Sequence, residues 1–373
     1  MKVIFTAEAG LGHIHPVIPL ARAAVAAGDE VLFAVPADGV ARVEAFGFAA
    51  TAVPSGDPAD IGRAWANLPD HDRNTYVVAD IFLRIQARAA LPAVQVLIES
   101  FGADLLVSAE LGSLVATEAS GIGGGMLGIT ALDLGDLDLT RVAAALDDLR
   151  ESAGLARSGR MPYDAGARYL SALPPLLWAD PAHLPPDAIW FRHEDAEGPV
   201  SSLVPTIRPR PQVYATLGSV AGANDFGRPI FRPVLDALGR LDADALFTVG
   251  PFDRDQLGPI PANVTVAAYA PQSEAMDCDV VVTHAGSGTT VAALARGLPL
   301  VAVPMFADQL HNADRLVAAG VGVRVDPEQV SDQLTKAIER VLKEPSYRIR
   351  AQQIAADIAA RPSPADALDL LRT

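Results

Sequence analysis

A glycine-rich turn follows the apolar run Val280-Val281-Val282-Thr283 and carries several hydrogen-bonding side chains. It reads His284-Ala285-Gly286-Ser287-Gly288-Thr289, and an alanine-rich helical stretch comes next. Glycines let a backbone approach a phosphate closely, and the hydroxyls of Ser287 and Thr289 add donors. A helix that begins there offers free N–H groups to an anion. The pattern favours a diphosphate site, although a purely structural turn is an equal alternative when this segment is taken alone.

A second glycine-rich turn, Gly10-Leu11-Gly12-His13-Ile14-His15-Pro16, follows the first apolar run of the chain. It is close to the dinucleotide fingerprint G-x-G-x-x-G, but His15 stands where the third glycine is required. We therefore exclude NAD binding at this turn, and its two histidines need another explanation.

The elements around both turns predict parallel α/β structure. Val3 to Thr6 is apolar, Pro16 to Ala27 has helical spacing and stops at Gly28, and Glu30 to Val35 is apolar again, which is a βαβ unit. A strand at Leu105 to Val107 and helices around residues 81–100 and 140–153 follow. Beyond a proline-rich stretch the pattern restarts, with predicted strands at residues 213–217, 246–249, 264–267, 280–283 and 300–303.

We predict an α/β protein of two doubly wound, Rossmann-like domains. Residues 1–193 form the first domain, 194–211 a linker and 212–350 the second domain. Residues 351–373 form a helical C-terminal segment, for which packing back on the first domain is one alternative. The carboxyl ends of the strands, where both glycine-rich turns lie, are where such sheets bind ligands.

The composition excludes several classes of function. A net charge of -16 over 373 residues disfavours nucleic acid as a partner. Cys278 is the single cysteine, so neither an internal disulfide nor a multi-cysteine metal site is expected, and no other cluster has metal-ligand character. No run of about 18 apolar residues occurs, so we expect a cytoplasmic protein without stable membrane insertion.

The segment around the diphosphate turn resembles a known signature. Tyr269-Ala270-Pro271-Gln272 precedes the turn, and Gly297-Leu298-Pro299, Pro304-Met305-Phe306-Ala307-Asp308-Gln309 and Asn312 follow it. This order and spacing resembles the nucleotide-sugar signature of the family 1 glycosyltransferases, a GT-B group that includes actinobacterial antibiotic glycosyltransferases. The resemblance extends to Thr216-Leu217-Gly218-Ser219 and the Gly-His-x-x-Pro turn, and it implies two Rossmann-like domains facing across a cleft.

The resemblance also implies roles for the donor-binding residues. Tyr269 would stack on the base, Ala270 and Gln272 would contact the base or ribose, and Asp308 and Gln309 would bind sugar hydroxyls. The diphosphate would be held by His284 together with Ser287, Gly288 and Thr289. The remaining donor-binding candidates are Gly12, Gly218, Ser219 and Gly286. A nucleotide-diphosphate sugar would then be the co-substrate, with no other cofactor and no metal.

One departure from the family pattern concerns the nucleotide. UDP-glucose members commonly place a glutamate eight residues after the diphosphate histidine, where it hydrogen-bonds the ribose hydroxyls, and this chain has Ala292. Alanine cannot pair with a 2′-hydroxyl, whereas a deoxyribose leaves no such group unsatisfied. We therefore expect a dTDP-sugar donor, with a UDP-sugar as the alternative.

The family's general base maps to His13, whose ordinary pKa near ~6.5 suits proton abstraction. A capping role is its alternative, and His15 is a minor candidate. The aspartate that orients this histidine in many members is Ala109 here, and Glu110 follows one residue later. Either an irregular turn lets Glu110 serve, or the dyad is absent, in which case Asp133 is a second candidate base, as in members that attach sugars to carbon. Asp136 and Asp138 share its acidic loop, which is alternatively a solvated surface.

The resemblance implies a single inverting displacement onto a small apolar aglycone such as a polyketide, by O- or C-glycosylation. The acceptor is expected at loops near residues 60–76 and 129–161. A rival class is a non-catalytic nucleotide-sugar-binding auxiliary protein, and homodimerisation is left open.

Overall fold

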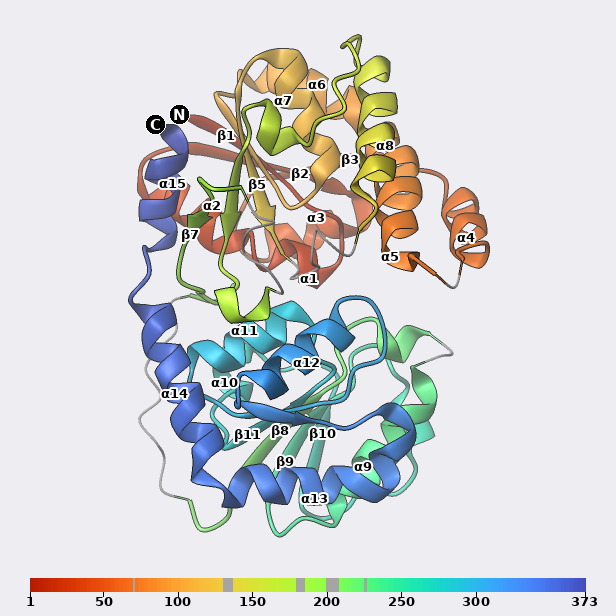
Figure 1. Ribbon diagram of the computed structural model, residues 1–373, viewed down its shortest axis with the longest axis vertical. Helices are drawn as coiled ribbons and strands as arrows, with labels where there is room; N and C mark the ends of the chain where they lie inside the picture. Colours follow the sequence, from red (N-terminus) through yellow and green to blue (C-terminus); the bar gives the residue numbers. More distant parts are fainter. Residues whose placement is uncertain (70, 130–136, 179–184, 199–207, 225–226) are drawn as a thin grey trace. The chain divides into compact units, whose positions relative to one another are not determined.

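The computed structural model describes residues 1–69, 71–129, 137–178, 185–198, 208–224 and 227–373, which form two compact units (Figure 1). Unit 1 comprises Met1–Ala172, Asp180–Phe191 and Pro362–Thr373. Unit 2 comprises Leu173–Ala179 and Arg192–Arg361. The short segment Leu173–Ala179, which lies within the predicted N-terminal domain, thus groups with unit 2, and Pro362–Thr373 at the C-terminus groups with unit 1.

Unit 1 is built on a parallel sheet in the order β3-β2-β1-β4-β5-β6-β7. Val3, Ile4 and Phe5 in the central strand are fully buried, as expected for a strand covered on both faces. The strand order reverses between β1 and β4, where Thr6 pairs with Ser108. Sheets of this kind bind ligands beyond the strand ends at such a switch point. The strands are β1 (Lys2–Thr6), β2 (Glu30–Pro36), β3 (Ala50–Val53), β4 (Leu105–Ser108), β5 (Gly123–Gly128), β6 (Arg168–Ser171) and β7 (Ile189–Trp190).

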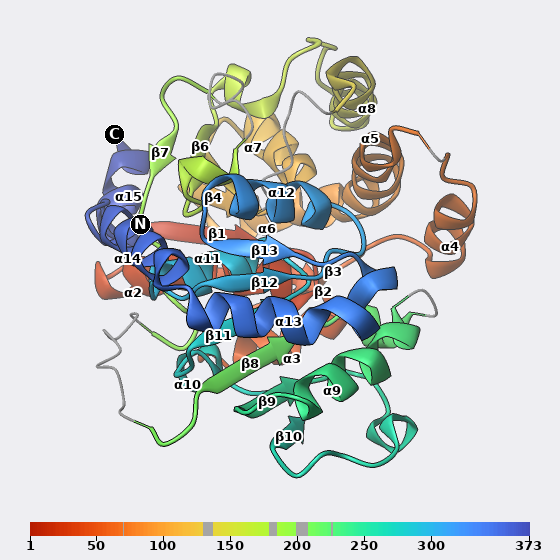
Figure 2. The ribbon, with the colours of Figure 1, turned by 60° about the horizontal axis from the view of Figure 1, so that its bottom comes forward.

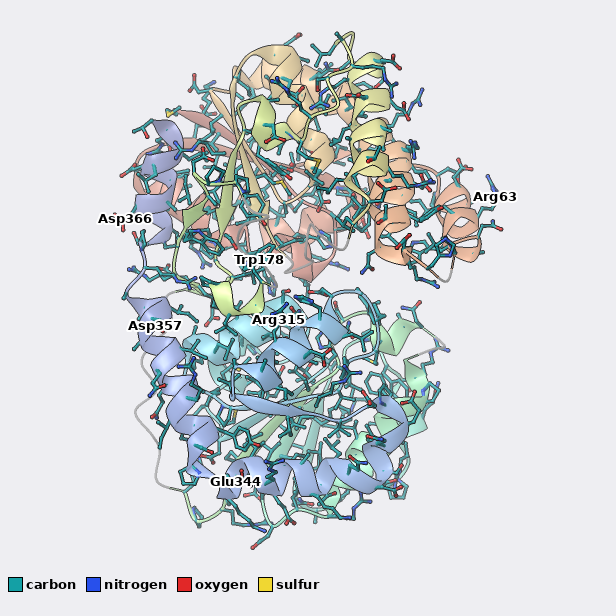
Figure 3. All side chains as sticks on the ribbon, in the orientation of Figure 1. Arg63, Trp178, Arg315, Glu344, Asp357 and Asp366 are labelled. Atoms are coloured by element: carbon teal, nitrogen blue, oxygen red, sulfur yellow. The ribbon has the colours of Figure 1, made fainter. Side chains whose placement is uncertain are left out.

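Helices cover this sheet, and the C-terminal one returns to it. The last helix, α15, begins with a capping box formed by Ser363 and Asp366, and it packs against α2. Asp366 is labelled in Figure 3. Arg372 near its end forms an ion pair with Asp29. The α-helices of unit 1 are α1 (Leu11–Ile14), α2 (Ile18–Ala26), α3 (Ala37–Glu44), α4 (Pro58–Ala66), α5 (Arg73–Tyr76), α6 (Arg88–Phe101), α7 (Leu114–Ser120), α8 (Leu139–Ser152) and α15 (Pro364–Arg372).

A continuous helical run, Arg73–Phe101, joins α5 and α6 through the π-helix η1 (Val77–Ala87). Judged by length and composition only, this run is the one helix among the described residues that could cross a membrane. Its middle packs on α8, and Ile81 and Leu83 are buried in the unit. Asp80 on the same segment is paired with Arg141 of α8, so η1 is part of the framework of unit 1.

Unit 2 repeats the architecture with a parallel sheet in the order β10-β9-β8-β11-β12-β13. The order reverses between β8 and β11, where Thr216 pairs with Thr283. Both glycine-rich segments of this unit therefore leave the sheet at neighbouring strand ends. The strands are β8 (Gln212–Thr216), β9 (Asp244–Thr248), β10 (Val264–Ala267), β11 (Val280–Thr283), β12 (Leu300–Ala302) and β13 (Gly322–Arg324).

The helices of unit 2 include α13, which buries Val330, Leu334, Ile338 and Val341 at helical spacing. Figure 2 shows α13 running across the sheet, in contact with β11, β12, β13 and α9. The predicted α/β class with two doubly wound sheets is confirmed. The α-helices are α9 (Phe231–Gly239), α10 (Gln272–Ala275), α11 (Ser287–Ala295), α12 (Gln309–Ala318), α13 (Val330–Lys343) and α14 (Pro345–Ala359).

Candidate active site

In unit 1, His13 and Glu110 meet at the switch point between β1 and β4. His13 lies in the short helix that follows β1, and its Nδ1 is 2.6 Å from Oε1 of Glu110. Their side chains are 29% and 17% exposed, so the pair is shielded yet reachable from solvent. With Nδ1–H donating to the carboxylate, the lone pair of Nε2 is left to accept a proton.

The position of Glu110 answers the question that the sequence left open. Strand β4 ends at Ser108, and Ala109 is buried instead of facing the histidine. The Ser108 hydroxyl donates to the carbonyl of Glu110 at 2.7 Å and accepts from its N–H at 2.8 Å, which bends the chain at the strand end. Thr6 Oγ1 donates to the same hydroxyl at 2.6 Å. This irregular turn, and not strand alternation, brings Glu110 to His13.

Charges around the pair perturb two pKa values. Burial works to lower the pKa of His13, but the charge and hydrogen bond of Glu110 and the charge of Glu8 outweigh it, so the pKa is raised. Burial, with repulsion from Glu110, raises the pKa of Glu8 to about 7. The backbone N–H of Glu8 donates to Oε1 of Glu110 at 3.3 Å, so the three residues form one acid–base cluster.

The other histidine and the acidic loop have different surroundings. The His15 ring stands edge-on to Phe46 with centroids 5.4 Å apart, whereas the His13 ring stands edge-on to Phe82 at 6.3 Å. Asp138 caps α8 by accepting from the N–H groups of Thr140 and Arg141, which is a structural role. Asp133 and Asp136 lie outside the described residues. Gly12 is exposed in the first turn of α1, in a different unit from the other donor-binding candidates.

In unit 2, the loop from β11 to α11 places His284 between two glycines. A Cβ at Gly218 would lie 2.7 Å from the His284 ring, and one at Gly286 would lie 2.4 Å from it. Both positions therefore require glycine, which explains why two separate loops carry it. Burial lowers the pKa of His284 to about 4, so the imidazole is neutral at pH 7. In this neutral form His284 can donate a hydrogen bond but carries no positive charge.

The N-terminal end of α11 follows directly. Gly286 caps the helix in an extended conformation, and the N–H of Thr290 is the first to reach back to its carbonyl. The N–H groups of Ser287, Gly288 and Thr289 thus point out of the helix end, beside His284. Gly288 and the neighbouring loop residue Ser219 are exposed. This is the geometry of an anion site at a helix N-terminus.

Asp308 and Asn312 brace this loop. Ser287 Oγ donates to Oδ2 of Asp308 at 2.6 Å, and the Asn312 amide donates to the same oxygen at 2.9 Å. Asn312 also donates to the carbonyl of Ala285 at 2.8 Å, which holds that alanine at φ +64° in the left-handed region. Asn312, the last residue of the signature, therefore fixes the loop between β11 and α11 through its side-chain amide. The motif alone does not reveal this role.

Gln309 is directed inward. Its Oε1 accepts the N–H groups of Met305 at 2.9 Å and Phe306 at 3.1 Å, and the residue is only 3% exposed. Its carbonyl is thus used by the turn before α12, whereas the half-buried Asp308 is more accessible. Of the two predicted sugar ligands, the geometry favours Asp308.

The predicted base-binding residues lie at the end of β10. Tyr269 is 55% exposed, Ala270 follows it, and Gln272 is half-buried at the start of α10. The Tyr269 hydroxyl donates to Glu197 Oε1 at 3.1 Å, a partner that the sequence did not suggest. Ala292 on α11 is fully buried, and its carbonyl accepts from Arg296, so this position offers no polar side chain to a ribose.

Among the described residues, no cluster of three or more His, Cys, Asp or Glu side chains could hold a metal ion. The groups that the candidate anion site of unit 2 offers are the backbone N–H groups at the start of α11, the Thr289 hydroxyl and the His284 imidazole.

Comparison with known proteins places these features in a family context. Residues 232–372 match the model of the erythromycin biosynthesis protein CIII-like C-terminal domain. The chain is 29% identical to an L-demethylnoviosyl transferase of Streptomyces niveus, over 98% of this chain and 96% of that protein. The crystal structure of the glycosyltransferase SnogD from Streptomyces nogalater superposes with a TM-score of 0.78 at 25% identity, covering 99% and 98% of the two chains.

A second solved structure shares the fold at lower identity. It is the glycosyltransferase SsfS6 of Streptomyces sp. SF2575 complexed with thymidine diphosphate, with a TM-score of 0.80, 24% identity and coverage of 100% and 99%.

Proposed function

We propose that this chain is a family 1 glycosyltransferase of GT-B fold, like the antibiotic-biosynthesis proteins that it resembles. In this proposal it transfers a deoxysugar from a dTDP-sugar to an apolar natural-product aglycone, with inversion and without a metal. The observation that carries the catalytic part of this proposal is the 2.6 Å contact between His13 Nδ1 and Glu110. It leaves Nε2 as the proton acceptor of a partly buried, oriented imidazole.

In the proposed reaction, His13 Nε2 takes the proton of an acceptor hydroxyl while the oxygen attacks the anomeric carbon. The bond between that carbon and the diphosphate oxygen breaks on the opposite face, and the electron pair leaves with dTDP. Glu110 stabilises the imidazolium that forms. The N–H groups of α11, the hydroxyl of Thr289 and His284 take up the charge of the leaving group, while the Ser287 hydroxyl stays bonded to Asp308.

We assign oxygen as the nucleophile. An absent dyad was the reason to consider carbon attack with Asp133 as base, and Glu110 at 2.6 Å from His13 supplies the dyad. Asp133→Ala tests the remaining alternative: a loss of turnover as large as that of His13→Ala would transfer the role of base to that loop.

The donor assignment rests on Ala292. A buried alanine whose carbonyl is engaged by Arg296 gives a ribose 2′-hydroxyl no partner. A UDP ligand would bury that hydroxyl unsatisfied, at a cost of about 1–3 kcal/mol, and dTDP would not. A dTDP donor is in line with the thymidine diphosphate bound to SsfS6, a glycosyltransferase of the same fold.

Calorimetric titration of dTDP and UDP into the wild-type protein tests the donor without knowledge of the acceptor. We expect dTDP to bind about tenfold more tightly, and tighter binding of UDP would overturn the assignment. Ala292→Glu is the matched variant, which should shift the preference toward UDP if the fold accepts the larger side chain. We place the reaction in the cytoplasm, where nucleotide sugars are made.

A further inference from the structure

A short turn in unit 2, Asp195–Gly198, reaches two elements of the nucleotide site. Asp195 and Gly198 form an antiparallel bridge, and the N–H of Gly198 donates to the carbonyl of Asp195 at 3.1 Å. Gly198 has φ +143°, a conformation that other residues rarely adopt. The turn therefore has a defined shape, with Glu197 exposed at its tip.

A buried ion pair anchors the turn to α11. Arg296, at the C-terminal end of that helix, is 2% exposed and pairs through both terminal nitrogens with Asp195, which is 1% exposed. His193 Nε2 lies 3.2 Å from the same carboxylate. Burial alone would raise the pKa of Asp195, but His193 and Arg296 lower it, so the carboxylate stays charged at neutral pH. Breaking such a pair is costly, which keeps the turn in one position.

The tip of the turn holds the ring on which we place the nucleobase. Glu197 Oε1 accepts from the Tyr269 hydroxyl at 3.1 Å. Partial burial, with Glu197 nearby, raises the pKa of Tyr269 to about 12, so the phenol keeps its proton and donates. More than half of Tyr269 is nevertheless exposed, at 55%, which leaves surface for a planar base.

We propose that Glu197 is a positioning residue for nucleoside recognition: it fixes the plane of the Tyr269 ring, and the Arg296–Asp195 pair sets the position of Glu197. This inference rests on the proposed function, because it takes Tyr269 as the base-stacking residue. An exposed tyrosine ring loses rotational freedom when a base stacks on it. A ring already held through its hydroxyl has less freedom to lose, so nucleoside affinity rises without any contact between Glu197 and the ligand.

The test is a mutant cycle read with two ligands, dTDP and inorganic pyrophosphate, titrated into the full chain. Pyrophosphate can use the α11 site but not Tyr269. We expect Glu197→Ala and Tyr269→Phe each to weaken dTDP about threefold, because an exposed hydrogen bond contributes little. The double variant should be no weaker than either single one, since both remove one interaction. Glu197→Gln, which keeps the acceptor, should bind dTDP as the wild type does, and pyrophosphate affinity should not change in any variant.

Two controls separate the possible failures. Glu328→Ala removes an exposed glutamate from another segment and should change neither affinity. If Glu197→Ala behaves like Glu328→Ala while Tyr269→Ala still weakens dTDP, stacking stands and the positioning role is refuted. If Tyr269→Ala leaves dTDP affinity unchanged, the proposed nucleoside site itself is wrong. Equal losses for dTDP and pyrophosphate in Glu197→Ala would also refute the proposal, because they indicate general damage.

The anchor is tested by Arg296→Lys, which keeps a cation but loses the two-pronged contact. We expect this variant to weaken dTDP at least as much as Glu197→Ala, with pyrophosphate binding preserved. Unchanged dTDP affinity would refute the anchoring role of Arg296. If the variant does not fold, the cycle on Glu197 and Tyr269 still decides the positioning role.

Discussion

Replacing Glu110 with glutamine should slow transfer and shift its pH dependence. Glutamine keeps an acceptor for Nδ1–H of His13, at the 2.6 Å contact, but removes the negative charge that stabilises the imidazolium. Hydrogen bonds to charged groups contribute about 1.5–3 kcal/mol, and partial exposure of both side chains places this one near the lower end. We therefore expect kcat to fall roughly 10- to 30-fold at pH 8.

The direction of the pH effect follows from the causes of the His13 pKa. Glu110 raises that pKa, so the substitution lowers it. Because the base must be neutral, the acidic limb of kcat/KM should move to lower pH in the variant. At pH 5 His13 is mostly protonated in the wild type and less so in the variant. The two values of kcat/KM should therefore lie closer together at pH 5 than at pH 8. Protonation of Glu8 near pH 7 should broaden the wild-type limb, since Glu8 also raises the His13 pKa.

The assay is kcat/KM for formation of the glycoside, followed chromatographically between pH 5 and 9 with saturating dTDP-sugar. Thermal unfolding of both proteins at each pH controls for loss of fold. An acidic limb that stays in place in Glu110→Gln, together with unchanged kcat at pH 8, would refute the dyad.

Three further substitutions, two of them paired with a control variant, test the site and the framework of the two units. Gly218→Ala places a Cβ 2.7 Å from the His284 ring at φ +76°. It should destabilise unit 2 by about 1–2 kcal/mol or more and weaken dTDP binding. Its control, Gly288→Ala, has no atom within 4 Å of the new Cβ and should leave the melting temperature unchanged or slightly higher. Glu8→Gln should stabilise the protein at pH 8 by up to about 3 kcal/mol and have little effect near pH 4. Folding raises the pKa of the Glu8 carboxyl from 4.5 to about 7, so the folded protein becomes less stable as the pH rises through that interval. Equal melting shifts at both pH values would contradict this. Arg150→Leu leaves the carboxylates of Glu118 and Asp147 without their buried partner and should lower the free energy of unfolding by about 3–5 kcal/mol. Arg157→Leu, at 45% exposure, should lower it far less in the same urea titration.

The strands that the sequence predicted are those with continuous apolar runs, such as Val3-Ile4-Phe5 and Val280-Val281-Val282. Strand β5 has no such run, because it begins with Gly123, Gly124 and Gly125, which favour a turn when taken as sequence. In the fold a Cβ at Gly125 would lie 2.7 Å from Leu371, a residue almost 250 positions later. The need for glycine there comes from tertiary packing that no local pattern shows.

The same contrast between local pattern and tertiary packing holds at the site. His284 and the α11 loop could be predicted, because strand, glycines and helix are contiguous in sequence. Glu110 could not be settled, since its orientation depends on the Ser108 hydroxyl and not on strand alternation. Gln309 is predicted to bind sugar hydroxyls, and no local pattern shows that its carbonyl oxygen also accepts the N–H groups of Met305 and Phe306. Glu197 is 72 residues from Tyr269 and became visible only in the folded unit.

The most direct measurement is the turnover of His13→Ala beside that of the wild type, with dTDP affinity measured on the same preparations. We predict that kcat falls by at least about a thousandfold while the Kd for dTDP stays within about twofold, since His13 acts on the acceptor and the diphosphate is bound in unit 2. Substantial transfer by the variant at unchanged dTDP affinity would contradict the assignment of His13 as the base.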